Sequence, residues 1–446
     1  MAHQERWHSR LTFILAAAGS AVGLGNIWKF PYITGMNGGG AFVLFYLACI
    51  AFVALPLLMC EMYIGAQGQA GAVRAFDNIH RPHTPYRWLG VLALVAVFLI
   101  LSFYSVIGGQ ILDFLQMTLR GQLTALDQTA IMQLSERLQA SPTRQIGGLA
   151  VFMLLNACVI AGGFKNGLER ANSWLMPALV AVLTLLFVRV LFLPGSTQAL
   201  AFLFRPNTDQ FTSSGVLDAI GHSFFTLNVA AAVHITYSSH LSSTQSLGRS
   251  ALIVAVFDTI IAMMFGVVIF AITFSFDVAP NSGPTLLFQT LPLLFAQIPG
   301  GQIIGTLFFV LVAFAALTSS LAMLEALVCH MTETNPNSRT RVSFALALAA
   351  FVAGIATALS PNVLASYTLW GHTPFALIDR LTANFCLPAG GIGMALFVGW
   401  VVGPKAVAVL LGARWADGWL APCFLWTIRL IAPAAVAVIW LQGLFA

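Results

Sequence analysis

The sequence predicts an all-α, polytopic membrane protein, and three observations carry that prediction. Of the 446 residues, 59% are hydrophobic and 8% are charged, whereas a soluble domain has about 25% charged residues. Long apolar segments recur along the whole chain, and they are long enough to cross a bilayer core as helices. The first segment is interrupted by glycines and an asparagine. In lipid, such an interruption is tolerated only where the freed backbone groups face protein or a polar cavity.

Apolar segments along the chain predict eleven membrane spans. We place them at 11–35, 40–67, 88–118, 146–163, 167–192, 215–238, 246–274, 302–330, 341–361, 374–399 and 421–444. No linker or low-complexity tract separates the segments, so we expect one transmembrane domain over residues 1–446. Three of the connections between spans are expected to have structure of their own. Segments 68–87 and 400–418 mix apolar and basic residues and are expected along the inner face of the membrane, and 275–300 is expected to be a folded outer loop with a small helix.

Basic residues favour one orientation of the chain. Most of the 20 lysines and arginines, Arg74, Arg81 and Arg87 among them, lie in segments that are cytoplasmic if the N-terminus is inside. The positive-inside rule then predicts a cytoplasmic N-terminus in the cell membrane, and an odd number of spans places the C-terminus outside. Topology also accounts for the net charge of +5. We therefore expect the lipid bilayer, and no nucleic acid, as the macromolecular surroundings.

The cysteines argue against a metal site, and the first apolar segment argues against a cleavable signal peptide. Six cysteines lie in apolar stretches without metal-ligand spacing and are expected to be reduced packing residues: Cys49, Cys60, Cys158, Cys329, Cys386 and Cys423. No cleavable signal peptide is expected, because the first apolar segment is too long and no clear cleavage site follows it.

The stretch from Gly19 to Pro31 (GSAVGLGNIWKFP) is the strongest signal in the chain. Each glycine weakens a helix by roughly 1 kcal/mol relative to alanine. Carbonyls freed at a break can bind a cation, and the half-helix that begins beyond it can bind an anion. Alternatively, these glycines allow close helix packing, and the stretch alone leaves both interpretations open.

A weaker break signal lies in the sixth span, in the stretch from Gly221 to Ala232 (GHSFFTLNVAAA). Its alanines favour helix, but its position is informative. Disrupted first and sixth spans are what an inverted repeat of five spans each places across a central site. Spans 11–192 would form one repeat and spans 215–399 the other, with 421–444 as an extra span.

Together, three motifs resemble the neurotransmitter:sodium symporter family, which has the LeuT fold. They are Gly19–Pro31, Phe224–Leu227 (FFTL) and Ala315–Ser320 (AALTSS), and the match extends from about Trp7 to Gly399. Eleven spans rather than twelve resembles many prokaryotic members. The resemblance implies a 5+5 inverted repeat with helices 1 and 6 broken. It also implies a sodium-coupled symporter that imports amino acids or related amines by alternating access, and no enzymatic activity.

The resemblance implies two sodium sites built from oxygen ligands, which hard cations prefer. The first would use Ala21, Asn26, Thr226, Asp258 and the substrate carboxylate, and the second would use Gly19, Val22, Ala315, Thr318 and Ser319. The alternative for the span-eight hydroxyls is a hydrogen bond back to their own helix.

The resemblance also implies a substrate pocket and two gates. The pocket would be lined by Ala21, Gly25, Ile100, Tyr104, Phe225, Thr226, Asn228, Ala231, Ser319 and Met323. A buried phenol needs a partner, so Tyr104 would bind the substrate carboxylate or make an interhelical hydrogen bond. Phe225, Lys29 and Asp379 would form the outer gate. Glu333 would be the acid of the inner gate, and Glu61, an ionisable group within span two, would brace the sixth span.

Four departures from the family pattern shape these expectations. Lys29 replaces the usual gate arginine and lacks its bidentate fork. Alanines 230–232 replace glycines around a bulky residue, which leaves room for a side chain and puts the unwinding of span six in doubt. Asp258 replaces a frequent asparagine, so a fixed negative charge predicts that chloride is not required. The inner-gate arginine falls at Gln4, and Arg6 or Arg10 would substitute for it.

Other functional classes have weaker support in the sequence. Gly221–Phe225 lacks the second glycine of a nucleophile elbow, and no HExxH motif occurs. His222, His234 and His240 have poor spacing for a metal site. The expected substrate is a neutral, hydrophobic L-amino acid, because an apolar pocket wall rewards buried apolar area and penalises an unpaired charge. Another amine, imino acid or zwitterion, a channel of the same fold and a receptor without transport remain alternatives.

Overall fold

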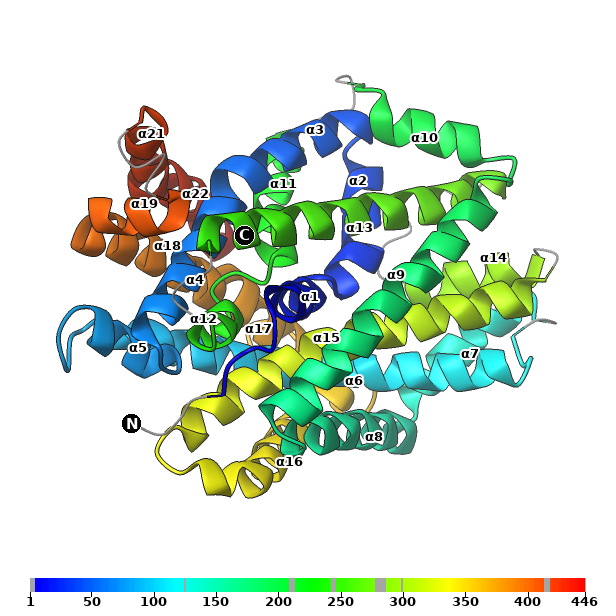
Figure 1. The fold of residues 1–446 in the computed structure, drawn as a ribbon. Coiled ribbons are helices and arrows are strands. Elements are labelled where there is room, and N and C mark those ends of the chain that lie inside the picture. The colour runs from blue at the N-terminus through cyan, green and yellow to red at the C-terminus, as the bar shows by residue number, and fades with distance from the viewer. Residues whose placement is uncertain are drawn as a thin grey trace.

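The computed structural model describes residues 5–123, 126–207, 213–241, 246–276, 286–297, 300–412 and 418–445. Within these ranges the regular structure is helical, apart from one isolated bridge between Leu369 and His372. The helices pack into a single bundle (Figure 1). Its core is made of buried aliphatic and aromatic side chains that are contributed by helices from α1 to α22.

Ten spans emerge from the described helices by length and hydropathy. Nine helices or helix runs are long and apolar enough to cross a membrane. They are α3–α4 (Gly40–Gly68), α6 (Arg87–Leu119), α8 (Pro142–Ala161), α9 with its preceding turn (Phe164–Val190), α13 (Leu247–Ser275), α15 (Gly301–Thr332), α16 with its preceding turn (Pro336–Ala358), α17–α18 (Pro374–Val402) and α21–α22 (Leu420–Gln442). A tenth is α1 (Arg10–Ala21) with Gly25–Met36, which includes α2 (Phe30–Met36) and is bent by 54°.

The eleventh span is divided into two pieces that are each too short to cross a membrane. They are α11 (Ser213–Thr226) and α12 (Val233–Ser239). The two interruptions, in the first and sixth spans, are therefore confirmed, and ten of the eleven predicted spans have the length and hydropathy of a membrane-crossing segment among the described residues.

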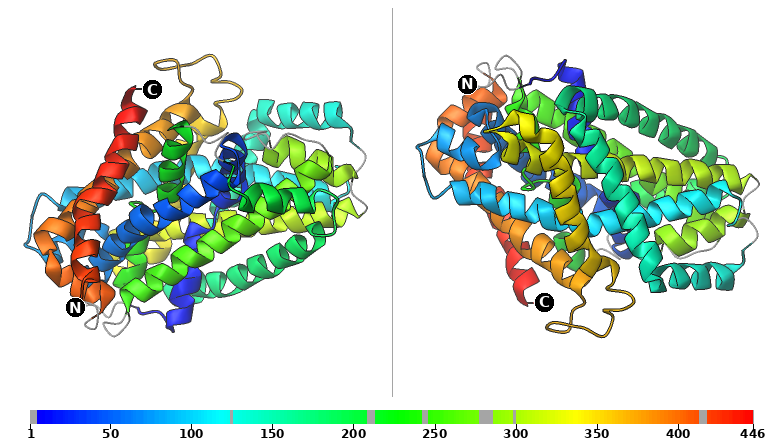
Figure 2. Two further views of the ribbon diagram at one scale, coloured as in Figure 1. Left: turned by 90° about the horizontal axis from the view of Figure 1, so that it is seen from above. Right: turned by 90° about the horizontal axis from the view of Figure 1, so that it is seen from below.

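The two interrupted spans lie in the middle of the bundle. Figure 1 shows α1 near its centre, where it packs against α9, α12, α13 and α15. α11 packs against α3, and α12 packs against α4. The last helix, α22 (Ala432–Phe445), packs against α18 at the edge of the bundle, as both views of Figure 2 show.

Short helices occupy the connections. α5 (Ala72–Ile79) lies in the segment 68–87 and α19 (Pro404–Leu411) in the segment 400–418. α14 (Leu291–Gln297) is the small helix expected within 275–300; residues 277–285, 298–299 and 413–417 of these connections lie outside the described residues. Two further helices were not predicted, α7 (Gln128–Ala140) and α10 (Ser196–Phe204).

All six cysteines are free. Four of them are buried, but Cys158 and Cys423 are exposed, so the prediction of a packing role is wrong for these two. Both lie on helices at the outside of the bundle, where one face of an apolar helix meets lipid rather than protein.

Candidate substrate and ion site

The first break separates α1 from the helix that begins at Gly25. Val22 adopts an extended conformation, with φ −70° and ψ 95°, and its N–H donates to the carbonyl of Ala18 at 2.7 Å. The asparagine beyond the break closes the turn, because its Oδ1 accepts from the N–H of Gly23 at 3.3 Å. The break thus directs several backbone carbonyls away from the helical ladder.

The second break spans residues 227–232 and contains no glycine. Asn228, Ala230 and Ala232 all have positive φ, at 51°, 66° and 59°. Two buried side chains hold this segment. The carboxylate of Glu61 accepts from the N–H of Ala230 at 2.8 Å, and Nε2 of His234 donates to the carbonyl of Leu227 at 2.8 Å. Span six is therefore unwound here despite its alanines, and Glu61 contacts it as expected.

Three predicted cation ligands meet between the two breaks. Asn26 Nδ2 donates to Asp258 Oδ1 at 2.8 Å, and Thr226 Oγ1 donates to Asp258 Oδ2 at 2.9 Å. All three side chains are at most 1% exposed. Carboxylate and hydroxyl oxygens suit a hard cation, and here they lie together beside the amide of Asn26, whose nitrogen faces the carboxylate.

A second group of oxygens lies at the end of α1. Ser319 Oγ lies 3.4 Å from the carbonyl oxygen of Gly19, 3.3 Å from that of Ser20 and 3.4 Å from that of Val22. One hydroxyl hydrogen can serve only one of these carbonyls at a time. Thr318 instead donates within its own helix, to Phe314 or Ala315 at 3.1 Å, which leaves its lone pairs available to a cation.

Two of the predicted pocket residues, Ser319 and Tyr104, lie beside the first break. A Cβ atom on Gly23 would lie 2.7 Å from Ser319 Oγ and 3.2 Å from the hydroxyl of Tyr104, so both groups lie directly against the break. Among the described residues, neither the Tyr104 hydroxyl nor Nδ2 of Asn228 has a hydrogen-bond partner. The apolar members of the predicted wall are buried: Ala21, Ile100, Ala231 and Met323.

The predicted outer gate is only partly assembled. Lys29 Nζ lies 4.2 Å from the centre of the Phe225 ring, a cation–π contact. That ring lies against Gly25, where a Cβ atom would come within 3.1 Å. Neither Asp379 nor Asp218 forms an ion pair with Lys29 among the described residues.

At the opposite end of α1, Trp7 links the start of the chain to neighbouring helices. Its indole Nε1 donates to the carbonyl of Tyr237 at 2.8 Å, and its ring packs on Phe164 and Tyr237. His240 is buried beside it, and burial is the main cause that lowers the pKa of His240 to about 4. The neutral ring donates from Nδ1 to the carbonyl of Glu5 at 2.5 Å.

The structure pairs the predicted inner-gate acid with an arginine that sequence reasoning did not select. Glu333 lies 3.8 Å from Arg74 and also accepts from the N–H of Gly71. Arg6 is exposed and makes no ion pair within the described residues. Arg10 donates to Ser250 at 3.2 Å, and Gln4 lies outside the described residues.

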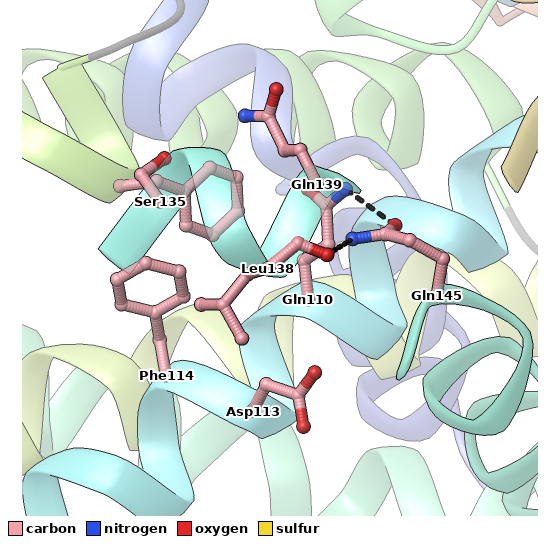
Figure 3. Close-up of a pocket in the computed structure, with 8 residues that line it drawn as sticks. Gln110, Asp113, Phe114, Ser135, Leu138, Gln139 and Gln145 are labelled. Carbon is pink, nitrogen blue, oxygen red and sulfur yellow. Dashed lines mark hydrogen bonds between the residues drawn. The ribbon is translucent and has the colours of Figure 1, made fainter. Parts of the chain in front are cut away.

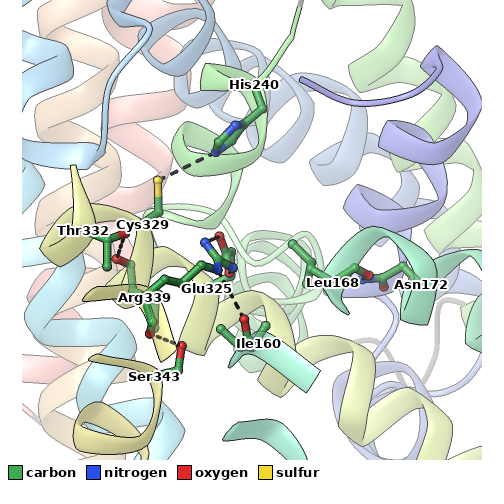
Figure 4. Close-up of polar contacts among 10 residues, drawn as sticks. Ile160, Leu168, Asn172, His240, Glu325, Cys329, Thr332, Arg339 and Ser343 are labelled. Carbon is green, nitrogen blue, oxygen red and sulfur yellow. Dashed lines mark hydrogen bonds and ion pairs between the residues drawn. The ribbon is translucent and has the colours of Figure 1, made fainter. Parts of the chain in front are cut away.

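Sequence reasoning missed a second ion pair at this end, whose acid is buried. Arg339 makes two hydrogen bonds to Glu325, at 3.1 and 2.5 Å, and a third to the carbonyl of Ile160 at 3.2 Å (Figure 4). Glu325 is fully buried. An acidic residue in the middle of an apolar span was the signal that could have revealed it.

A small pocket lies away from both breaks. Figure 3 shows its lining, which combines Asp113 and several amide side chains with apolar side chains. It is lined by Gln110, Asp113, Phe114, Ser135, Leu138, Gln139, Gln145 and Phe288, none of which was predicted as a site residue.

Comparison with known proteins identifies the family. The family model described as "Sodium:neurotransmitter symporter family" matches residues 4–139 and 128–445. The chain belongs to the sodium:neurotransmitter symporter family. It is 36% identical to an uncharacterised sodium-dependent transporter of Bacillus subtilis, over 98% of this chain and 97% of that protein. It is also 29% identical to the sodium-dependent neutral amino acid transporter B(0)AT3 of Rattus norvegicus, over 60% of this chain and 47% of that protein.

The fold agrees with this assignment. The crystal structure of MhsT in complex with L-phenylalanine matches with a TM-score of 0.90 and 38% identity, over 99% of this chain and 100% of that chain. This symporter therefore has the LeuT fold with interrupted first and sixth spans. Membership of the family makes the chain a multi-pass, sodium-dependent symporter of small molecules.

Proposed function

We propose that this symporter couples sodium to the uptake of a neutral, hydrophobic L-amino acid. The observation that carries the proposal is the meeting of both breaks at one buried place. Oxygen ligands from α13 and α15 gather there, beside an apolar wall. Such an arrangement binds a small ion and an uncharged side chain in adjacent positions, as transporters with discontinuous helices do.

Sodium is proposed to bind at two sites. The first comprises the carbonyl of Ala21 with Asn26, Thr226, Asp258 and the substrate carboxylate. The second comprises carbonyls of Gly19, Val22 and Ala315 with the hydroxyls of Thr318 and Ser319. The hydrogen bonds among Asn26, Thr226 and Asp258 support the first site, and the carbonyls around Ser319 support the second. We propose that the Asp258 carboxylate supplies the negative charge at this site, so that transport does not require chloride.

The substrate is proposed to lie between Tyr104 and the wall formed by Ile100, Ala231 and Met323. The unpartnered Tyr104 hydroxyl supports a role in binding the substrate carboxylate. MhsT was crystallised with L-phenylalanine, and the rat relative is described as a neutral amino acid transporter. Each buried CH₂ of the substrate would contribute about 0.8 kcal/mol, which favours large apolar side chains over glycine or alanine.

Alternating access would use the two ends of α1 as gates. We place the N-terminus and the Trp7 end in the cytoplasm, and Lys29, Phe225 and Asp379 on the extracytoplasmic side. The C-terminus then lies outside the cell membrane. Glu333 is proposed to act at the inner gate with Arg74, the arginine that it contacts.

The proposal is tested by thermal unfolding of the purified protein with each of the twenty L-amino acids, in sodium and in potassium. Because a ligand stabilises the state that binds it, leucine, phenylalanine or tryptophan should raise the melting temperature in sodium only. Replacing chloride with gluconate should leave that shift unchanged. Stabilisation by a charged amino acid, or equally in potassium, would contradict the proposed substrate and coupling. A shift that needs chloride would contradict the role of Asp258.

A further inference from the structure

Asn172, in α9, has a buried side-chain oxygen that accepts no hydrogen bond from the described residues. The side chain is fully buried, and its Nδ2 donates to the carbonyl of Leu168 at 3.0 Å, one turn back in the same helix. That bond fixes the orientation of the amide, because only its nitrogen can donate to a carbonyl. Among the described residues, Oδ1 has no hydrogen-bond partner. Figure 4 shows Asn172 and Leu168 together on their helix.

The free oxygen lies directly against α1. A Cβ atom on Gly19 would lie 3.0 Å from Asn172 Oδ1, so glycine is the residue that leaves room for the amide. α9 packs against both α1 and α15, which places Asn172 where the three helices meet. The carbonyl of the same Gly19 faces Ser319 Oγ at 3.4 Å.

A structural role does not account for this oxygen. A buried acceptor without a donor is unfavourable by about 1–3 kcal/mol, and a leucine would fill a comparable volume without that cost. The oxygen is favourable only where a cation or a donor approaches it. Its neighbour on α1 belongs to the carbonyl cluster around Ser319, which already has more acceptors than the serine hydroxyl can satisfy.

We propose that Asn172 supplies an additional oxygen ligand, from α9, to the cation bound at the Ser319 cluster. This inference rests on the proposed sodium coupling and extends its second site from two helices to three. A neutral amide suits the position, because it completes the oxygen shell of a monovalent ion without adding a charge that would have to be buried when the ion leaves.

The test measures sodium binding rather than transport. The melting temperature of the full-length protein is followed against sodium concentration, with choline holding the ionic strength constant, and the half-saturating sodium concentration is compared. Asn172→Leu should raise that concentration about tenfold, as expected for loss of one oxygen ligand to a charged group. Asn172→Asp, measured at pH 8, should lower it, because a carboxylate attracts the ion strongly in a buried site. Ser173→Ala, a change on the same helix that removes only a bond to the carbonyl of Glu169, should leave it unchanged.

The outcomes separate this inference from the proposed function. If the wild type responds to sodium and both Asn172 variants keep its half-saturating concentration, Asn172 is not a ligand and the inference is overturned. If the wild type shows no sodium response at all, sodium coupling fails and the inference fails with it. Should Asn172→Leu not fold, Asn172→Asp decides the matter, because packing alone gives no reason for a rise in sodium affinity.

Discussion

The two breaks at the centre of this symporter are built in opposite ways. The first break is rich in glycine, and its carbonyls turn towards a serine on α15. The second break has alanine where glycine would be easiest, and places Ala230 and Ala232 at positive φ. For a residue with a Cβ atom, that conformation costs roughly 1–2 kcal/mol. The first break is therefore easy for the chain to form, whereas the second has to be held in place.

The side chains around each break follow from this difference. Around the second break, Glu61 and His234 use their polar atoms to satisfy backbone groups of Ala230 and Leu227. Around the first break, Ser319 faces more carbonyl oxygens than its one hydroxyl hydrogen can serve, and Asn172 Oδ1 has no partner among the described residues. One break is thus braced by its neighbours, while the other presents its oxygens to a ligand. Four predictions test this contrast.

The largest effect is expected from the brace of the second break. Glu61→Ala leaves the N–H of Ala230 without its acceptor in a fully buried place. Together with the cavity, this should lower the free energy of unfolding by about 3 kcal/mol and abolish sodium-dependent uptake. Thermal unfolding and uptake into proteoliposomes measure the two effects. Glu136→Ala, at an exposed position on α7, is the control. A Glu61→Ala protein with normal stability and uptake would show that span six stays unwound without Glu61.

The next effect is expected at the first break, from Gly23→Ala. The new methyl group would lie 2.7 Å from Ser319 Oγ and 3.2 Å from the Tyr104 hydroxyl, so both must move. Overpacking of this kind costs about 1–3 kcal/mol, and we expect sodium-dependent substrate binding to weaken at least tenfold. Gly221→Ala is the matched control, since the nearest atom to its Cβ is 4.0 Å away. Equal effects of the two substitutions would mean that the break does not need the close approach.

Much of this architecture could be predicted from the sequence, and the reasons are physical. Hydropathy predicted the spans, ten of which the described helices match in length and composition, because a bilayer core demands long apolar helices. Three glycines revealed the first break. The second break was doubtful, because propensity favours helix in an alanine run and the brace that overrides it comes from Glu61, far away in the sequence. Tertiary contacts, not local helix propensity, determine the conformation of that segment.

The missed residues share one property. Glu325 pairs with Arg339, His234 bonds to Leu227, and Asn172 has an oxygen that lies against Gly19. Each is a polar residue within a largely apolar span, and its role depends on which helix faces it. The pairing of Glu333 with Arg74 rather than with Arg6 depends in the same way on where α5 packs. Sequence marks such residues as candidates but does not identify their partners.

A smaller effect, on selectivity, is expected from Ala231→Phe in the second break. Ala231 is fully buried in the proposed pocket wall, and a phenyl group there would take the volume of a large substrate side chain. Affinity for leucine or tryptophan should fall about tenfold more than affinity for alanine, which corresponds to about 1.4 kcal/mol. Competition binding in sodium measures the ratio. An equal loss for all sizes would place Ala231 outside the pocket.

The smallest effect, and the most direct comparison of the two breaks, is expected from the same substitution made in each. Ala232→Gly relieves a residue at φ 59°, a gain of roughly 1–2 kcal/mol, while glycine loses about 0.5–1 kcal/mol through the greater freedom of the unfolded chain. The net expectation is a stabilisation of about 0.5 kcal/mol. Ala21→Gly changes the last residue of α1, where no positive φ is relieved. Only the entropic cost of glycine remains, so this variant should be destabilised by up to about 1 kcal/mol. Thermal unfolding without substrate compares the two variants. Destabilisation by both would show that Ala232 is not strained, and that the second break forms as readily as the first.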